Sequence, residues 1–210
     1  MKILFSLILT FFICSTYTYA ESFSVLGENF NISISNDLCI LHNNNPVENV
    51  VLQSIQAVPQ GLELPVSFVD CNSLNKIKNG IDVNVFSTLG GIKNHNKKYI
   101  YSSQLFLEEM ERQFNVESSS LDSLINKNIN KSAHDKKISG VFSASGTKFL
   151  GKDENTIYLS GNALVNGTVF PFISAFTLQK GVVFNIEVYS NQISTSELFE
   201  IVKEIKNQLN

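Results

Sequence analysis

The sequence predicts an α+β domain: an antiparallel sheet that ends in a C-terminal four-stranded meander, with helices packed mainly on one face. Three observations predict this fold class. Amphipathic helical stripes recur between residues 46 and 130, period-two strands with short turn signals follow from Lys137 onward, and one more amphipathic helix closes the chain. The helices therefore have an apolar face to bury, and the strands supply a sheet to bury it against.

The first twenty residues have the layout of a secretory signal peptide. Lys2 precedes an apolar run from Ile3 to Ile13, and the small residues Thr18 and Ala20 stand at the positions that a signal peptidase reads. That run is well short of the about 20 residues that span a bilayer, which disfavours an uncleaved anchor. We expect a signal peptide at residues 1–20, a single α+β domain at 21–210, and no membrane span after signal removal.

Strands and helices alternate in the first part of the expected domain. Asn45 is a side-chain cap and Pro46 a favourable first residue for one of these helices. Gly90-Gly91 is expected to end a strand, and the polar residues 92–98 are expected to form an exposed loop. In chain order the expected elements are strand 29–34, helix 46–57, strand 64–68, a short helix around 74–77, and strand 81–85.

Two amphipathic helices are expected at 103–114 and 119–130, followed by the four-stranded meander. Asn166-Gly167 accepts the positive φ angles of a two-residue hairpin turn. Pro171 lies inside a strand, where its missing N–H predicts a bulge or an unpaired edge. Ser194 and Glu197 have capping-box spacing and begin the closing helix.

Composition and motifs disfavour several classes of function. The net charge is −3, from 16 basic and 19 acidic residues, and no Lys/Arg cluster with interleaved aromatics indicates nucleic-acid binding. The sequence contains no H-E-x-x-H, G-x-S-x-G, complete G-x-x-x-x-G-K-[S/T] or G-x-G-x-x-G, so we predict no catalytic residues and no cofactor. A triad of His134, Asp135 and Ser102 or Ser103 can be written down, but serine is too common here for it to be informative.

The cysteines indicate a disulfide rather than a metal site. Cys39 and His42 have ligand-like spacing, but a structural zinc needs four ligands, and Cys71, His95 and His134 are scattered. We therefore expect no metal. Cys39 and Cys71 are the two cysteines left after signal removal, so an exported protein would pair them. The 33-residue loop would add about 3 to 4 kcal/mol of stability on the chain-entropy model.

Two strands of the meander carry polar side chains at alternate positions. A sheet face of this composition is suited to a peptide or a small polar ligand, and the alternative is an ordinary solvated face. The candidate binding residues are Tyr158, Ser160 and Asn162 on one strand and Asn185, Glu187 and Tyr189 on the other.

Residues 29–80 resemble a group of uncharacterised exported bacterial proteins with a paired-cysteine N-terminal region. The resemblance lies in a strand, Asp37-Leu-Cys39, a helix begun by Pro46, and Phe68-Val-Asp-Cys71-Asn-Ser-Leu74. The closing meander and helix resemble PsbP/Mog1-type domains in topology, which implies an accessory or binding module.

We therefore expect an exported, non-enzymatic accessory or binding protein, periplasmic or extracellular, whose partner is an unknown protein, peptide or small polar ligand. The alternative is a secreted hydrolase with an unrecognised Ser/His or carboxylate site. The two differ in where the histidines lie: an enzyme needs His42, His95 or His134 in a cleft beside a nucleophile or an acid.

Overall fold

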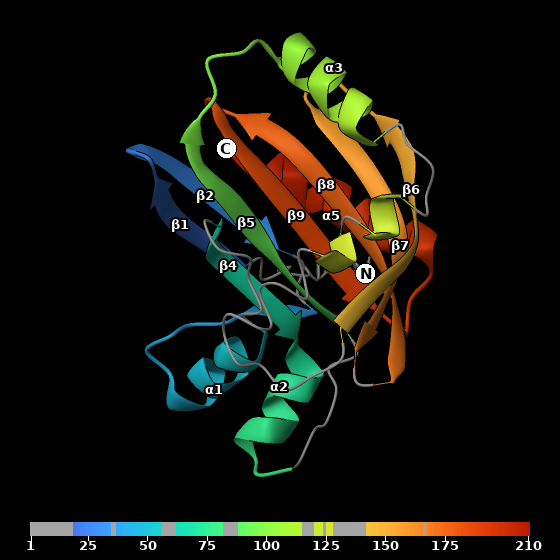
Figure 1. Cartoon of the computed structure of the whole chain (residues 1–210). Helices are drawn as coiled ribbons and strands as arrows, with labels where there is room; N and C mark the ends of the chain where they lie inside the picture. The colour runs from blue at the N-terminus through green and yellow to red at the C-terminus, as the bar shows by residue number, and fades with distance from the viewer. Residues whose placement is uncertain are drawn as a thin grey trace, which may run out of the picture.

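The computed structural model describes residues 19–34, 37–55, 62–81, 88–114, 120–123, 125–127, 142–165 and 167–210 (Figure 1). Within these residues a seven-stranded antiparallel sheet has the order β3-β4-β5-β9-β8-β7-β6, and β1 and β2 form a separate hairpin. The α+β class with an antiparallel sheet is thus confirmed. The strands are β1 (Tyr19–Val25), β2 (Glu28–Ile34), β3 (Leu38–Ile40), β4 (Leu62–Asp70), β5 (Thr88–Lys98), β6 (Phe142–Lys152), β7 (Thr156–Val165), β8 (Thr168–Gln179) and β9 (Val182–Ser190); the helices are α1 (Pro46–Ile55), α2 (Cys71–Lys78), α3 (Ser103–Phe114) and α5 (Thr195–Gln208).

Strands β6 to β9 form the predicted four-stranded meander. Val165 pairs with Thr168, so two residues turn the chain between β7 and β8, and Gly167 has a φ of 84°. Asn166 itself lies outside the described residues. Pro171 stands one position before Phe172, where the β8–β9 ladder begins, so its missing N–H costs that ladder nothing.

Helix α5 covers one face of the sheet, which we call the α5 face. Ser194 and Glu197 form the predicted capping box, and Leu198, Val202 and Ile205 are buried at helical spacing. The β1–β2 hairpin packs on the same face, where the rings of Phe30 and Phe184 lie 4.8 Å apart edge to face. Helix α5 and the β1–β2 hairpin together cover the largest apolar core among the described residues.

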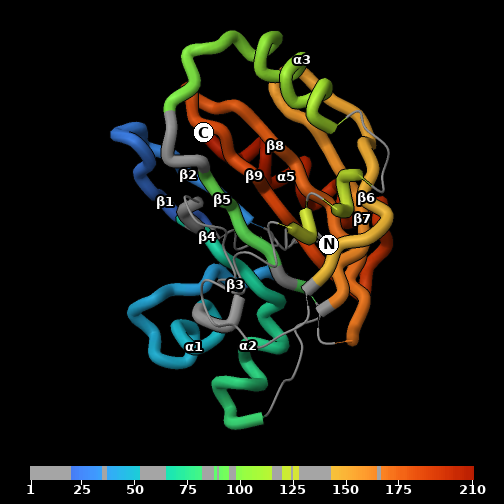
Figure 2. The backbone as a smooth tube through the Cα atoms, in the orientation of Figure 1, coloured from blue at the N-terminus to red at the C-terminus, as the bar shows by residue number. Residues whose placement is uncertain are grey.

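The opposite face, which we call the front face, is turned toward the viewer in Figure 1. Helices α1 and α2 pack at its β3–β4 edge around Val69, and α3 packs at its β6–β7 side against Ile157 and Leu159. The trace of the chain in Figure 2 shows these two groups of helices at opposite ends of the sheet, so the middle of the front face lies between them.

A helical segment beside β6 protects the edge of the sheet. The Asn126 side-chain amide donates to the Ala144 carbonyl at 2.9 Å and accepts from the Ala144 N–H at 2.6 Å. The Asp122 carboxylate accepts from the N–H groups of Gly146 and Thr147. These contacts occupy hydrogen-bonding groups that an exposed edge strand would offer to another chain.

The predicted disulfide is present between Cys39 and Cys71, with the two Cα atoms 5.0 Å apart. Cys39 lies on β3 and Cys71 begins α2 immediately after β4, so the bond joins neighbouring strand ends. Helix α1 begins as predicted, with the Asn45 side chain accepting from the N–H of Val47 at 3.0 Å. Its Glu48 accepts from Lys78 of α2 at 2.5 Å, which ties α1, inside the disulfide loop, to α2, which follows the loop.

The expected end of a strand at Gly90-Gly91 and the expected loop at 92–98 are both wrong. β5 runs through both stretches and is paired to β4 on one side and β9 on the other. Gly90 is needed for packing: a Cβ there would lie 2.5 Å from the Phe68 ring and 2.4 Å from the carbonyl oxygen of Glu187. Residues 82–87, which hold most of the expected strand 81–85, lie outside the described residues.

Other expectations fall wholly or partly on residues that the structure does not describe. Residues 1–18 lie outside it, and β1 begins with Tyr19 and Ala20, paired to Ile34 and Ser33. The predicted cleavage position before Glu21 therefore falls within this strand. Of the helix expected at 119–130, residues 120–123 and 125–127 are helical and the rest are not described. Among the described helices, none is long and apolar enough to cross a bilayer.

Candidate functional site

The structure divides the six predicted binding residues between the two faces of the sheet. Strand β8 lies between β7 and β9, so the register passes from Tyr158 through Ala175 to Ile186. Residues in one such row share a face. Tyr158, Ser160 and Asn162 consequently belong to the α5 face, whereas Asn185, Glu187 and Tyr189 belong to the front face.

Tyr158 is fixed beneath α5 and is not displayed to solvent. Its hydroxyl donates to Asp153 at 2.6 Å, and Lys206 of α5 lies 3.2 Å from the same carboxylate oxygen. Burial and the charge of Asp153 raise the pKa of Tyr158 above its ordinary value. Ser160 is also buried, and Asn162 is exposed near the end of β7. The contacts of Asp153 with Tyr158 and with Lys206 hold α5 on the sheet.

The other three residues join two more in a connected polar group. We call Lys93, Ser174, Asn185, Glu187 and Tyr189 the front-face cluster. Lys93 pairs with Glu187 Oε2, and Tyr189 donates to the same oxygen at 2.7 Å. Asn185 donates to Glu187 Oε1 at 2.7 Å and accepts from the Ser174 hydroxyl at 2.6 Å. Lys93 of β5 and two residues of β9 thus bind the Glu187 carboxylate directly, and Ser174 of β8 is linked to it through Asn185.

The electrostatics of the cluster fix its protonation. Burial opposes ionisation of Glu187, but the charge of Lys93 and three donated hydrogen bonds outweigh it, so the pKa of Glu187 lies below its ordinary value. Burial and the Glu187 charge raise the pKa of Tyr189 well above its ordinary value. At neutral pH the cluster therefore contains the Glu187 carboxylate and a neutral Tyr189 phenol.

The floor around the cluster is formed by glycine and an aromatic ring. Gly91 of β5 stands opposite Glu187 of β9, so no β5 side chain separates the carboxylate from β4. On the other side Phe172 lies over Gly161, where a Cβ would come within 2.7 Å of the ring, and its centroid is 5.6 Å from that of Tyr189. Both the Lys93 and Glu187 side chains remain partly accessible, at 20% and 15%.

Ser67 of β4 adds an unsatisfied polar group to this face. It stands opposite Gly91 and so lies in the same row of the sheet as Glu187. It is 2% exposed, and its hydroxyl has no hydrogen-bond partner among the described residues. A buried hydroxyl without a partner is costly, and such sites are often occupied by a water molecule or a ligand group.

Among the described residues, the front-face cluster contains no pairing of a nucleophile with a general base. Ser174 donates to an amide oxygen, so nothing in the described cluster draws off its proton. The His42 ring lies 3.9 Å from Glu21 with about half of its side chain exposed, and Glu21 belongs to the β1–β2 hairpin. His134 lies outside the described residues, as does the side chain of His95. Among the described residues no group of three His, Cys, Asp or Glu side chains is placed to hold a metal ion.

The sequence interpretation missed Lys93, Ser174 and Ser67. Lys93 was hidden because the stretch around it was assigned to a loop. Ser67 and Ser174 were detectable, since alternation along β4 and β8 puts both on the face opposite Phe68 and Ile173. The signal in the sequence was a polar residue at a strand position next to an apolar residue of the opposite face.

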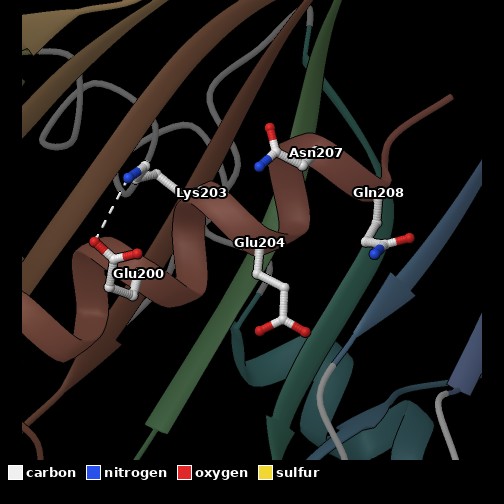
Figure 3. A pocket seen from close by; sticks show the side chains of 5 residues that line it. All are labelled: Glu200, Lys203, Glu204, Asn207 and Gln208. Carbon is white, nitrogen blue, oxygen red and sulfur yellow. Dashed lines mark ion pairs between the residues drawn. The ribbon is translucent and has the colours of Figure 1, made fainter.

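The outward side of α5 carries a surface depression (Figure 3). Glu200 and Lys203 form an ion pair there at 3.6 Å. The depression is lined by Glu200, Lys203, Glu204, Asn207 and Gln208. All five lie within about two and a half turns of one solvent-facing helix, and such charged faces are usual on surface helices.

No protein-family model and no curated protein matches the chain. Among solved structures, the chain is similar to the solution structure of cyanobacterial PsbP (CyanoP) from Synechocystis sp. PCC 6803, with a TM-score of 0.47 and 9% sequence identity over 91% of each chain. That solved structure is of a PsbP domain, the kind of domain that the closing meander and helix resemble in topology. The resemblance of residues 29–80 to exported bacterial proteins stays a prediction.

Proposed function

We propose that this chain is an exported, non-enzymatic binding protein that takes a small polar ligand, or a polar group of a peptide, at the front-face cluster. The observation that carries the proposal is the Lys93–Glu187 pair. It places charge in the middle of a sheet face, between two groups of helices, where a closed core would place apolar side chains.

The unused hydrogen-bonding capacity of the cluster indicates the kind of ligand. An ammonium group has three donors, and within the described chain Lys93 uses one of them on Glu187. The Tyr189 oxygen donates one bond and retains its acceptor capacity, and Ser67 is unpartnered. A ligand carrying a carboxylate or carbonyl acceptor beside a donor matches these groups.

Binding explains the cluster better than hydrolysis does. A general base works best with a pKa near the working pH, and the pKa of Glu187 is lowered, further from pH 7. The pKa of Tyr189 is raised well above its ordinary value, so neither group changes its protonation state near pH 7. Fixed protonation states are instead what a selective hydrogen-bonding site requires.

Export is supported by two features of the chain. Disulfides persist in oxidising compartments, and Cys39 and Cys71 are bonded. The N-terminal twenty residues have the signal-peptide layout. Both favour a periplasmic or extracellular location.

The test is a thermal-shift screen of amino acids, short peptides and dicarboxylates against wild type, Lys93→Met and Lys148→Met. Lys148 is the matched control because it is an exposed lysine on β6. We expect at least one compound that raises the melting temperature of wild type and of the control but not of Lys93→Met. Compounds that stabilise all three proteins equally would place binding elsewhere, and turnover of an ester or peptide by the wild type would favour the hydrolase.

A further inference from the structure

A second surface feature lies at one end of the sheet, away from the front-face cluster. The connection from β5 to α3, visible in Figure 1, and the first turn of α3 hold three apolar residues that are exposed to solvent by their solvent accessibility. Ile100 is 99% exposed, Tyr101 62% and Leu105 53%. We call these three residues the apolar tip. Single exposed apolar residues are ordinary, but here three lie within six positions of the chain.

The apolar tip is held outward by anchors on both sides. Before it, the Tyr99 N–H donates to the Gly181 carbonyl at 2.7 Å, and the Tyr99 ring packs into the core beneath α3. After Tyr101, Ser102 caps α3 by accepting from the N–H of Leu105 at 3.3 Å. Ile100 and Tyr101 lie between these fixed points, so the backbone presents their side chains to solvent.

Two lysines lie on segments next to the apolar tip. Lys98 lies two positions before Ile100, and Lys180 is on the β8–β9 turn whose Gly181 binds Tyr99, where its ammonium donates to the Asn29 carbonyl at 2.8 Å. Lys98 pairs with Glu28 at 2.6 Å, so the acid offsets part of this charge. The arrangement of an exposed aliphatic, a tyrosine and adjacent lysines matches the residues that proteins place at the membrane–water interface.

We propose that the apolar tip docks on the surface of a lipid bilayer, inserting Ile100 among the headgroups, with a preference for anionic lipid. Three side chains on a projecting connection fall well short of the roughly 800 Å² that each partner contributes to a stable protein interface. They are sufficient for peripheral insertion, where apolar burial and lysine–headgroup attraction add. Protein partners are therefore the less fitting occupant.

The test uses vesicles of phosphatidylcholine alone and of phosphatidylcholine mixed with phosphatidylglycerol. The chain is produced from Tyr19, since the contacts that close the fold described above lie among residues from Tyr19 on and an apolar leader would itself bind lipid. In co-sedimentation we expect binding that is stronger to the mixed vesicles and about tenfold weaker for Ile100→Ser with Tyr101→Ser, because burying one large aliphatic side chain is worth about a factor of ten. The matched control, Val50→Ser with Ile81→Ser, replaces side chains that are 68% and 55% exposed elsewhere and should bind as wild type does.

A position-specific reporter makes the outcome sharper. The chain has no tryptophan, so Ile100→Trp and Val50→Trp each supply one emitter. We expect the emission at position 100 to shift to the blue on adding mixed vesicles and that at position 50 to stay unchanged. Failure of the wild type to sediment with either vesicle, equal loss in the two double variants, or equal shifts of the two emitters would overturn the proposal.

Discussion

Replacing Cys39 and Cys71 by alanine should lower the free energy of unfolding by about 4 kcal/mol. The bond joins residues separated by 32 positions, so it closes a 33-residue loop. On the chain-entropy model, closing that loop removes about 12.5 cal/mol/K from the unfolded state, or about 3.7 kcal/mol at 25 °C. For a chain of this size a loss of that magnitude lowers the melting temperature by roughly 8 to 15 °C.

The folded state should change little in the same variant. Both cysteines lie beside elements with their own contacts: Cys39 pairs with Val69, and Asp70 caps α2 by accepting from Ser73 at 2.7 Å. The Glu48–Lys78 pair also links α1 to α2 without the disulfide. The loss should therefore come from greater freedom of the unfolded chain, and circular dichroism of the folded variant should match wild type.

The assay is urea unfolding of the double variant, of wild type, and of wild type kept reduced. The variant and the reduced wild type should have the same lowered midpoint. A loss below about 1 kcal/mol would refute the entropic reasoning. Intact mass after alkylation without reduction gives a separate check, because labelling of both Cys39 and Cys71 in the native protein would show that the bond is absent.

Three further predictions concern the sheet. Glu187→Gln leaves the Lys93 charge without its partner and should cost about 3 kcal/mol in urea unfolding, whereas Glu187→Leu combined with Lys93→Met should cost much less. Because the folded pKa of Glu187 is depressed, its contribution to stability is present above the unfolded pKa of about 4.3 and is lost as pH falls through the folded value, so Glu187→Gln should flatten the acid limb of the stability–pH curve. Asn126→Ala should cost about 1 to 2 kcal/mol and speed hydrogen exchange of the Ala144 N–H, with no change in exchange predicted on β9.

Local signals in the sequence predicted the elements whose causes are local. The capping box at Ser194 and Glu197, the Asn45 cap and the two-residue turn before Thr168 each depend on residues within four positions of one another. Such interactions form in the chain segment itself and need no knowledge of its neighbours. The disulfide was predictable for a different reason, since only one pairing is available once the leader is excluded.

β5 could not be predicted because its causes are distant in the sequence. A pair of glycines ordinarily ends a strand, but Gly90 lies under the Phe68 ring of the neighbouring strand. Lys93 looks like a loop residue until Glu187, 94 positions away, supplies its partner. Tertiary contacts override local preference at both positions.

The predicted binding face failed to form as one surface for a topological reason. Alternation along a single strand correctly separated Glu187 from Ile186, and likewise Tyr158 from Leu159. It did not reveal which face of β7 adjoins which face of β9, because that depends on the register through β8. An offset of one residue in that register would have placed all six residues together.

The two proposals concern separate regions, so the variants made for one region serve as controls for the other. The front-face cluster depends on side chains of β5, β8 and β9, whereas the apolar tip depends on the connection that follows β5. Lys93→Met should therefore bind vesicles as wild type does, and Ile100→Ser with Tyr101→Ser should keep its response to any ligand found in the thermal screen. If instead each change abolished both activities, the common cause would be displacement of β5, which links the two regions, and hydrogen exchange along β5 would show it.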